Sequence, residues 1–171
     1  MLDQVPIERL VGTGVRVDVT TPCARNRDHR VTIQDLEQWE AAHARIPDQA
    51  IVLLDTGFAR FWPSRQEYLG TELRGQEGVR ALHFPGLHPE AAAWLVRERL
   101  VKAVGIDTAS IDHPDDATYP AHHALLGANV PVIENVANLS ALRSSAFWLL
   151  ALPLNLQGTS GSPIRLVALA K

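Results

Sequence analysis

The chain has a single cysteine, Cys23, among its 171 residues, and it has no long hydrophobic run. One thiol excludes an internal disulfide framework and fits a reducing compartment. The longest apolar stretch, residues 146–154, is far too short to span a bilayer, and residues 1–12 lack the basic and apolar regions of a signal peptide. The sequence therefore predicts a cytoplasmic protein that has no membrane partner.

Clustered basic charge is also missing. The net charge is −3, from 16 basic and 19 acidic side chains, and the arginines are scattered along the chain. Nothing in this pattern suits nucleic acid or an anionic membrane. The length, the 46% hydrophobic content and the 20% charged content are those of one ordinary globular domain with a real core.

What the chain does have is a series of short apolar runs that alternate with helical patterns. Because several runs are continuously apolar, they predict an α/β domain with a partly parallel, well-covered sheet. Residues 58–78 are polar and aromatic and predict a loop region. The expected strands are residues 15–19, 51–54, 101–106, 130–133, 147–156 and 164–170, and the expected helices are residues 33–45 (capped by Thr32), 89–100 and 121–127.

The strongest chemical signal is the pair His122 and Glu134, twelve residues apart in the segment YPAHHALLGANVPVIENVANL, residues 119–139. Imidazole and carboxylate together suit zinc or manganese. On spacing alone, a surface histidine and a locally paired glutamate are the better interpretation, because two ligands do not make a metal site. Glu134 follows an expected strand, at the edge of the sheet where open α/β folds usually bind ligands.

The same segment carries a resemblance, together with FPGLHPEAAAWLV (84–96), GIDTASID (105–112) and GTSGSPIRLVAL (158–169). From about Asp3 to the C-terminus, these four blocks resemble, in the same order, the cyclase family that includes bacterial kynurenine formamidase and isatin hydrolase. The resemblance implies a single domain with the family's swivelling β/β/α fold. It also implies a homo-oligomer and an arylformamidase-like hydrolysis of a small molecule, N-formylkynurenine to kynurenine and formate.

Residue by residue, Pro120, His122, Glu134 and Asn135 match the family's second metal-ligand segment. The resemblance therefore implies that His122 and Glu134 bind zinc or manganese, with the adjacent His123 as the fallback ligand. Asn135 and His123 are also candidates to support a ligand or to lie near the substrate.

Two carboxylates after the expected strand 101–106 remain open to two interpretations. Asp107 and Asp112 could orient a ligand histidine. Equally, Asp107 could accept hydrogen bonds from loop amides at the end of the strand. The glycine-rich residues 158–161 are best read as a turn between strands, although this block approaches the active site in the family. The aromatic residues of the loop region, Tyr68 among them, predict core or subunit interface.

The family's first ligand cluster, His-x-Gly-Thr-His-x-Asp followed by Pro-x-His, has no counterpart in residues 1–171. Since a catalytic zinc normally takes three protein ligands, we expect weak metal binding and poor catalysis from this chain as it stands. The proton-transfer histidine has no match, so the catalytic residues stay unassigned. Three explanations are open: an N-terminally truncated enzyme, a non-catalytic homologue that binds small molecules or proteins, or a site completed by another chain.

Overall fold

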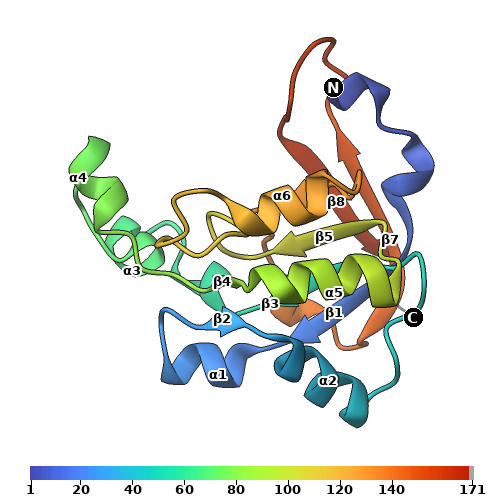
Figure 1. Ribbon diagram of the computed structural model, residues 1–171, viewed down its shortest axis with the longest axis horizontal. Helices are drawn as coiled ribbons and strands as arrows, with labels where there is room; N and C mark the ends of the chain where they lie inside the picture. Colours follow the sequence, from blue (N-terminus) through green and yellow to red (C-terminus); the bar gives the residue numbers. More distant parts are fainter. Residues whose placement is uncertain (170–171) are drawn as a thin grey trace.

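Six strands form a curled, mixed sheet in the order β6-β5-β3-β1-β7-β8 in the computed structural model, which describes residues 1–169 (Figure 1). Strands β6, β5, β3 and β1 run parallel, and β7 and β8 continue the sheet antiparallel. The partly parallel sheet agrees with the prediction. The strands are β1 (Val11–Asp18), β3 (Ile51–Asp55), β5 (Ala103–Ile106), β6 (Val132–Ile133), β7 (Ala146–Pro153) and β8 (Ile164–Leu169).

Helices and one small sheet fill the connections. Strands β2 (Arg30–Val31) and β4 (Gly86–Leu87) pair in parallel beside the main sheet. The α-helices are α1 (Thr20–Arg25), α2 (Ile33–Ala42), α3 (Arg65–Leu69), α4 (Gly75–Arg80), α5 (Pro89–Arg99) and α6 (Pro120–Leu126). The 3-10 helices are η1 (Leu2–Gln4), η2 (Ile7–Arg9), η3 (Phe58–Phe61) and η4 (Leu139–Ala141).

The local sequence signals explain which elements were predictable. Thr32 caps α2 in a capping box with Asp35, as predicted.

The prediction of a loop over residues 58–78 was wrong, because this segment contains η3, α3 and the first four residues of α4. Each of these helices has six residues or fewer, so apolar side chains have no room to recur at helical spacing. The predicted end of the last strand, Ala170, lies outside the described residues.

Helices α1, α2, α5 and α6 cover one face of the sheet. Side chains of β1, β3 and β5 on this face pack against buried residues of α2, α5 and α6, among them Leu36, Leu95 and Leu125. Figure 1 shows α5 and α6 lying across the sheet, with α1 and α2 below them. This face therefore has the closed, well-covered core that the sequence predicted.

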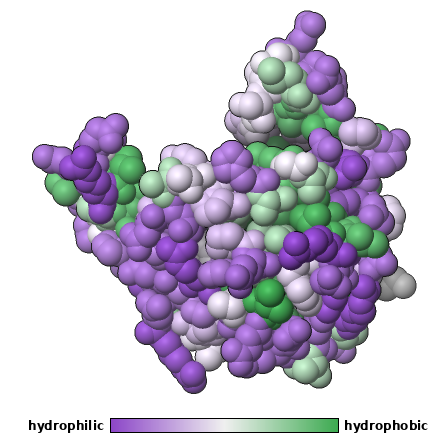
Figure 2. All heavy atoms as spheres, viewed as in Figure 1, coloured by the Kyte–Doolittle hydropathy of each residue, from purple (hydrophilic) through white to green (hydrophobic). Residues whose placement is uncertain are grey.

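The opposite face is more open. Its apolar side chains include Leu53, Ile133 and Leu149, and they pack against η4 and the N-terminal segment rather than against a long helix. Strands β7 and β8 project from the body with η1 beside them (Figure 1), and Leu2 donates its backbone N–H to the carbonyl of Thr159. Apolar surface extends from this hairpin to the body (Figure 2). Among residues 1–169, no helix is long and apolar enough to cross a membrane.

Candidate metal site

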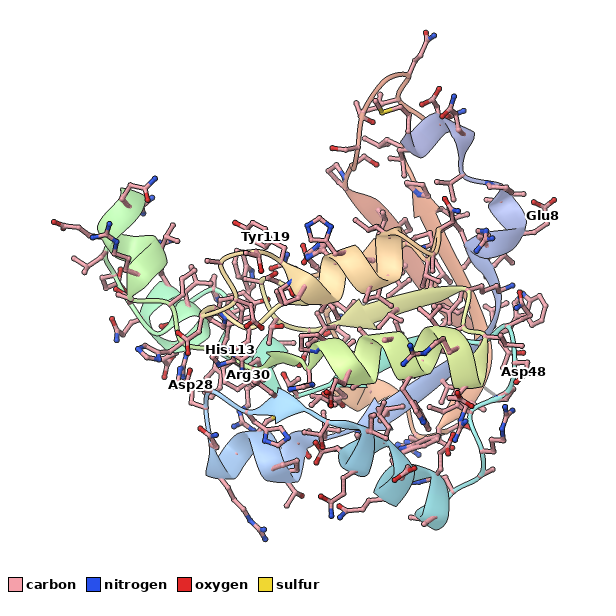
Figure 3. The ribbon with its side chains drawn as sticks, in the orientation of Figure 1. Glu8, Asp28, Arg30, Asp48, His113 and Tyr119 are labelled. Atoms are coloured by element: carbon pink, nitrogen blue, oxygen red, sulfur yellow. The ribbon has the colours of Figure 1, made fainter. Side chains whose placement is uncertain are left out.

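The parallel strands bring two loops to one edge of the sheet. Strand β5 pairs in parallel with β6, and Gly105 stands opposite Ile133. The residues that follow, Asp107 after β5 and Glu134 after β6, therefore leave the sheet at the same edge. The loop of residues 107–119 then leads into α6, which carries His122 in its first turn. Figure 3 labels two residues of this loop, His113 and Tyr119.

His122 and Glu134, the two predicted metal ligands, lie side by side. Nε2 of His122 is 3.4 Å from Oε1 of Glu134. The two side chains are 27% and 29% exposed, so both remain accessible to a ligand. The ring of Tyr119 meets the His122 ring edge to face, with centroids 6.2 Å apart.

Loop residues 107–112 hold both side chains in place. The backbone N–H of Ile111 donates to Oε1 of Glu134 at 2.9 Å. On the other side, Nδ1 of His122 lies 2.5 Å from Oδ2 of the buried Asp112. Of the two carboxylates considered from the sequence, Asp112 is thus the one that contacts the histidine.

Asp107 has other partners. One of its carboxylate oxygens accepts from the backbone N–H and the hydroxyl of Thr56, at 3.0 and 2.5 Å. The other oxygen accepts from the backbone N–H of Ala59 at 3.1 Å. These contacts match the interpretation of Asp107 as a carboxylate that satisfies loop amides at the end of a strand.

Asn135 and His123 occupy the margins of the site. Asn135 is exposed and adopts a left-handed conformation with φ 55° directly after Glu134. His123 is exposed on α6, one position beyond His122. The contact with Glu134 is made by His122, which is the residue that the family motif matches.

Tyr68, which the sequence predicted only as a core or interface residue, is a neighbour of the site. Its hydroxyl is 2.9 Å from the backbone oxygen of Asp107 and 3.0 Å from Oδ1 of Asn135, and its one proton can go to either. Burial, and then the charges of Asp107 and Glu134, raise the pKa of Tyr68. Tyr68 therefore stays a neutral phenol at physiological pH. It lies 67 residues from Asn135 in the chain, so no local pattern could have revealed the contact.

His113 lies next to Asp112 but belongs to a different environment. It is 5% exposed, and Figure 3 shows it close to Arg30. Burial, and then the charge of Arg30, lower the pKa of His113. A neutral, buried imidazole here contributes to the packing of the loop.

The donor set fits part of a divalent-metal site. Zinc bonds of about 2.0–2.2 Å to nitrogen and oxygen allow one ion to contact both His122 Nε2 and Glu134 Oε1 at their separation. Within residues 1–169, no group of three or more histidine, cysteine, aspartate or glutamate side chains is arranged to hold a metal. Two donors are fewer than a catalytic zinc normally requires, so these residues by themselves provide a partial site.

Two open cavities, of about 900 and 740 Å³, adjoin this partial site. Both are lined by Glu134, and the smaller one also by His122. Gly161 and Ser162 of the β7–β8 turn line both cavities as well. Part of the glycine-rich block therefore borders the same cavities as Glu134.

Comparison with known proteins supports the resemblance. A family model described as "Putative cyclase" matches residues 1–113, so His122 and Glu134 lie beyond the matched segment. The chain is 37% identical over 83 residues to kynurenine formamidase of Bacillus cereus, covering 48% of this chain and 39% of that protein.

Solved structures match almost the whole chain. Isatin hydrolase A from Labrenzia aggregata, bound to benzyl benzoate, superposes with a TM-score of 0.87 at 33% identity, over 99% of this chain and 64% of that one. A potential metal-dependent hydrolase with cyclase activity superposes with a TM-score of 0.69 at 25% identity, over 97% of this chain and 68% of that one. The chain thus spans less than two thirds of the length of the isatin hydrolase.

Proposed function

Because the chain belongs to the "Putative cyclase" family, we propose that it carries part of the site of a metal-dependent hydrolase. The proposed reaction is hydrolysis of an amide-like C–N bond in a small molecule, with N-formylkynurenine as the candidate substrate and kynurenine and formate as products. The observation that carries the proposal is the contact of His122 with Glu134 at the carboxyl edge of the sheet, beside two open cavities.

In this proposal, Nε2 of His122 and the carboxylate of Glu134 hold a divalent cation, zinc or manganese. A bound cation of this kind lowers the pKa of water and polarises a carbonyl group. The chain's own residues orient these donors: Ile111 holds Glu134 by its backbone N–H, and Gly161 and Ser162 border the space where a substrate would lie. Asn135 and the phenol of Tyr68 supply further polar groups next to Glu134.

The small donor set favours a second candidate function. Among residues 1–169, His122 and Glu134 supply two donors where a catalytic zinc normally has three protein ligands, and the two cavities are open to a small molecule. The alternative is therefore a non-catalytic homologue that binds small molecules or proteins. Isatin hydrolase A is itself described with bound benzyl benzoate, so binding of an aromatic small molecule is a reasonable probe.

A hydrolysis assay separates the two functions. The purified chain is incubated with N-formylkynurenine and with isatin, each with zinc or manganese, and product formation is compared with that of His122→Ala and Glu134→Ala. Turnover that disappears in both variants supports the hydrolase. No turnover, combined with saturable binding of kynurenine to the unaltered chain, supports the binding protein and rejects catalysis by this chain.

We also expect the chain to form at least a dimer. The projecting hairpin exposes large apolar side chains that water solvates poorly, and such patches mark contact surfaces. Sedimentation velocity should show a species larger than a monomer, and Leu154→Glu combined with Leu156→Glu should shift it toward monomer. Leu126→Glu, an equally exposed leucine on α6, is the control. A clean monomer of the unaltered chain would contradict this prediction. The exposed large apolar side chains of the hairpin are those of Trp148, Leu152, Leu154, Leu156, Ile164 and Leu169.

A further inference from the structure

We propose that Asp112 is a positioning residue, which fixes the ring of His122 so that Nε2 faces Glu134 as an unprotonated donor. This inference deepens the proposed metal site and rests on it. Asp112 would orient His122 in this way before any cation binds.

Asp112 concentrates three hydrogen bonds on one buried carboxylate. Oδ1 accepts from the backbone N–H of Ala121 at 2.6 Å. Oδ2 accepts from the backbone N–H of His122 at 3.2 Å and lies 2.5 Å from Nδ1 of the same residue. Asp112 is 2% exposed, so water cannot replace these bonds easily. Both the backbone and the ring of His122 are therefore held by one side chain.

The chemistry of the two groups decides which ring nitrogen carries the proton. An ionised carboxylate only accepts hydrogen bonds, so Nδ1 must carry a hydrogen to bond to Asp112. In the neutral imidazole, the other nitrogen then has its lone pair free. This nitrogen, Nε2, lies 3.4 Å from Oε1 of Glu134. Asp112 thus favours the tautomer and the ring orientation that a metal ligand needs, in competition with Glu134, whose carboxylate would accept a proton carried by Nε2.

The position of Asp112 is itself fixed by the fold. The backbone N–H of Leu87 in β4 donates to the carbonyl of Ile111 at 2.7 Å, and the hydroxyl of Ser110 accepts from the backbone N–H of Asp112 at 3.2 Å. Ile111, one residue earlier, holds Glu134 through its own N–H. A single short loop therefore sets the relative position of both donors.

Asp112 also satisfies backbone N–H groups at the start of α6, so a structural role must be separated from the positioning role. The chain contains a close match for this purpose. Asp35 accepts from the backbone N–H and the hydroxyl of Thr32 and contacts Nε2 of His29 at 3.0 Å. Asp35→Asn disturbs the start of α2 in the way that Asp112→Asn disturbs the start of α6, but it leaves His122 untouched.

The first readout is the tautomer of His122 in the metal-free chain. Long-range proton–nitrogen spectra are recorded over a pH series that extends until the ring signals stop changing, and His122→Ala identifies the signals. We expect a proton on Nδ1 in the unaltered chain. In Asp112→Asn the carboxamide presents N–H groups next to the ring, so the Nε2–H form should increase, and Asp112→Glu should restore part of the original state. A proton on Nε2 in the unaltered chain would overturn the proposal without any variant.

The second readout is affinity for zinc, measured by competition with a chromogenic chelator. Loss of a carboxylate that orients a ligand histidine typically lowers metal affinity about 10–100-fold. We expect a loss of this size in Asp112→Asn, and an unchanged affinity in Asp35→Asn. Equal affinities in the unaltered chain and Asp112→Asn would refute the inference and leave the metal site standing. If the unaltered chain binds no zinc, the proposed function fails, while the tautomer still reports on Asp112 independently.

Discussion

Replacing Gly86 with alanine is expected to destabilise the protein by about 2–3 kcal/mol, and valine should leave little folded protein. A Cβ atom at Gly86 would lie 2.4 Å from the backbone nitrogen of His113 and 2.7 Å from the carbonyl carbon of Asp112. These are backbone atoms of the loop that holds His122 and Glu134, so no flexible side chain can move aside. Urea denaturation followed by circular dichroism measures the loss.

The matched control is Gly161→Ala. A Cβ atom at Gly161 meets nothing within 4 Å, so the free energy of unfolding should change little. A Gly86→Ala chain as stable as the unaltered one would mean that the contact between β4 and the loop of residues 107–119 is looser than described.

Removing the carboxylate of Asp107 should be costly too, and it separates the two interpretations of this residue. Asp107→Ala would leave the buried N–H and hydroxyl of Thr56 and the partly buried N–H of Ala59 without their acceptor, and each such buried group costs about 1–3 kcal/mol. Part of this destabilisation is offset. Burial and then the Asp107 charge raise the pKa of Asp55, and Asp107→Ala would remove the repulsion between the two carboxylates. We expect a net loss of about 2–4 kcal/mol in urea denaturation.

Asp107→Asn keeps one acceptor and should lose less than Asp107→Ala. Both variants should retain the zinc affinity of the unaltered chain wherever they remain folded, because Asp107 contacts neither His122 nor Glu134. An Asp107→Ala chain of normal stability that no longer binds zinc would instead place Asp107 in the metal site.

The parts of this molecule that could be predicted were those that a local sequence pattern determines. Thr32 and Asp35 predict the start of α2. The apolar run that ends at Ile133 predicts a strand and so places Glu134 at the edge of the sheet. The position of His122 came from its match to the family motif, because spacing alone did not favour a site. Short helices such as α3 are defined by a cap at Ser64 and a left-handed Gly70, and they carry too few residues for a periodic signal.

The groups that hold His122 and Glu134 in place could not be predicted from local sequence patterns. The sequence offered Asp107 and Asp112 equally, because both follow the same strand, and only the path of the loop sends one to Thr56 and the other to His122. The N–H of Ile111 is a backbone donor, which no sequence pattern marks. Contacts of this kind depend on tertiary packing between β4, β5 and α6.

The central claim is that His122 and Glu134 hold one divalent cation on this chain, and a zinc titration tests it most directly. The purified chain is titrated beside His122→Ala, Glu134→Ala and the adjacent control His123→Ala, with zinc per chain measured by mass spectrometry after equilibrium dialysis. The account predicts one weakly held zinc per chain, lost in the first two variants and retained in His123→Ala. Zinc bound equally by the unaltered chain and His122→Ala, or lost in His123→Ala, would contradict it.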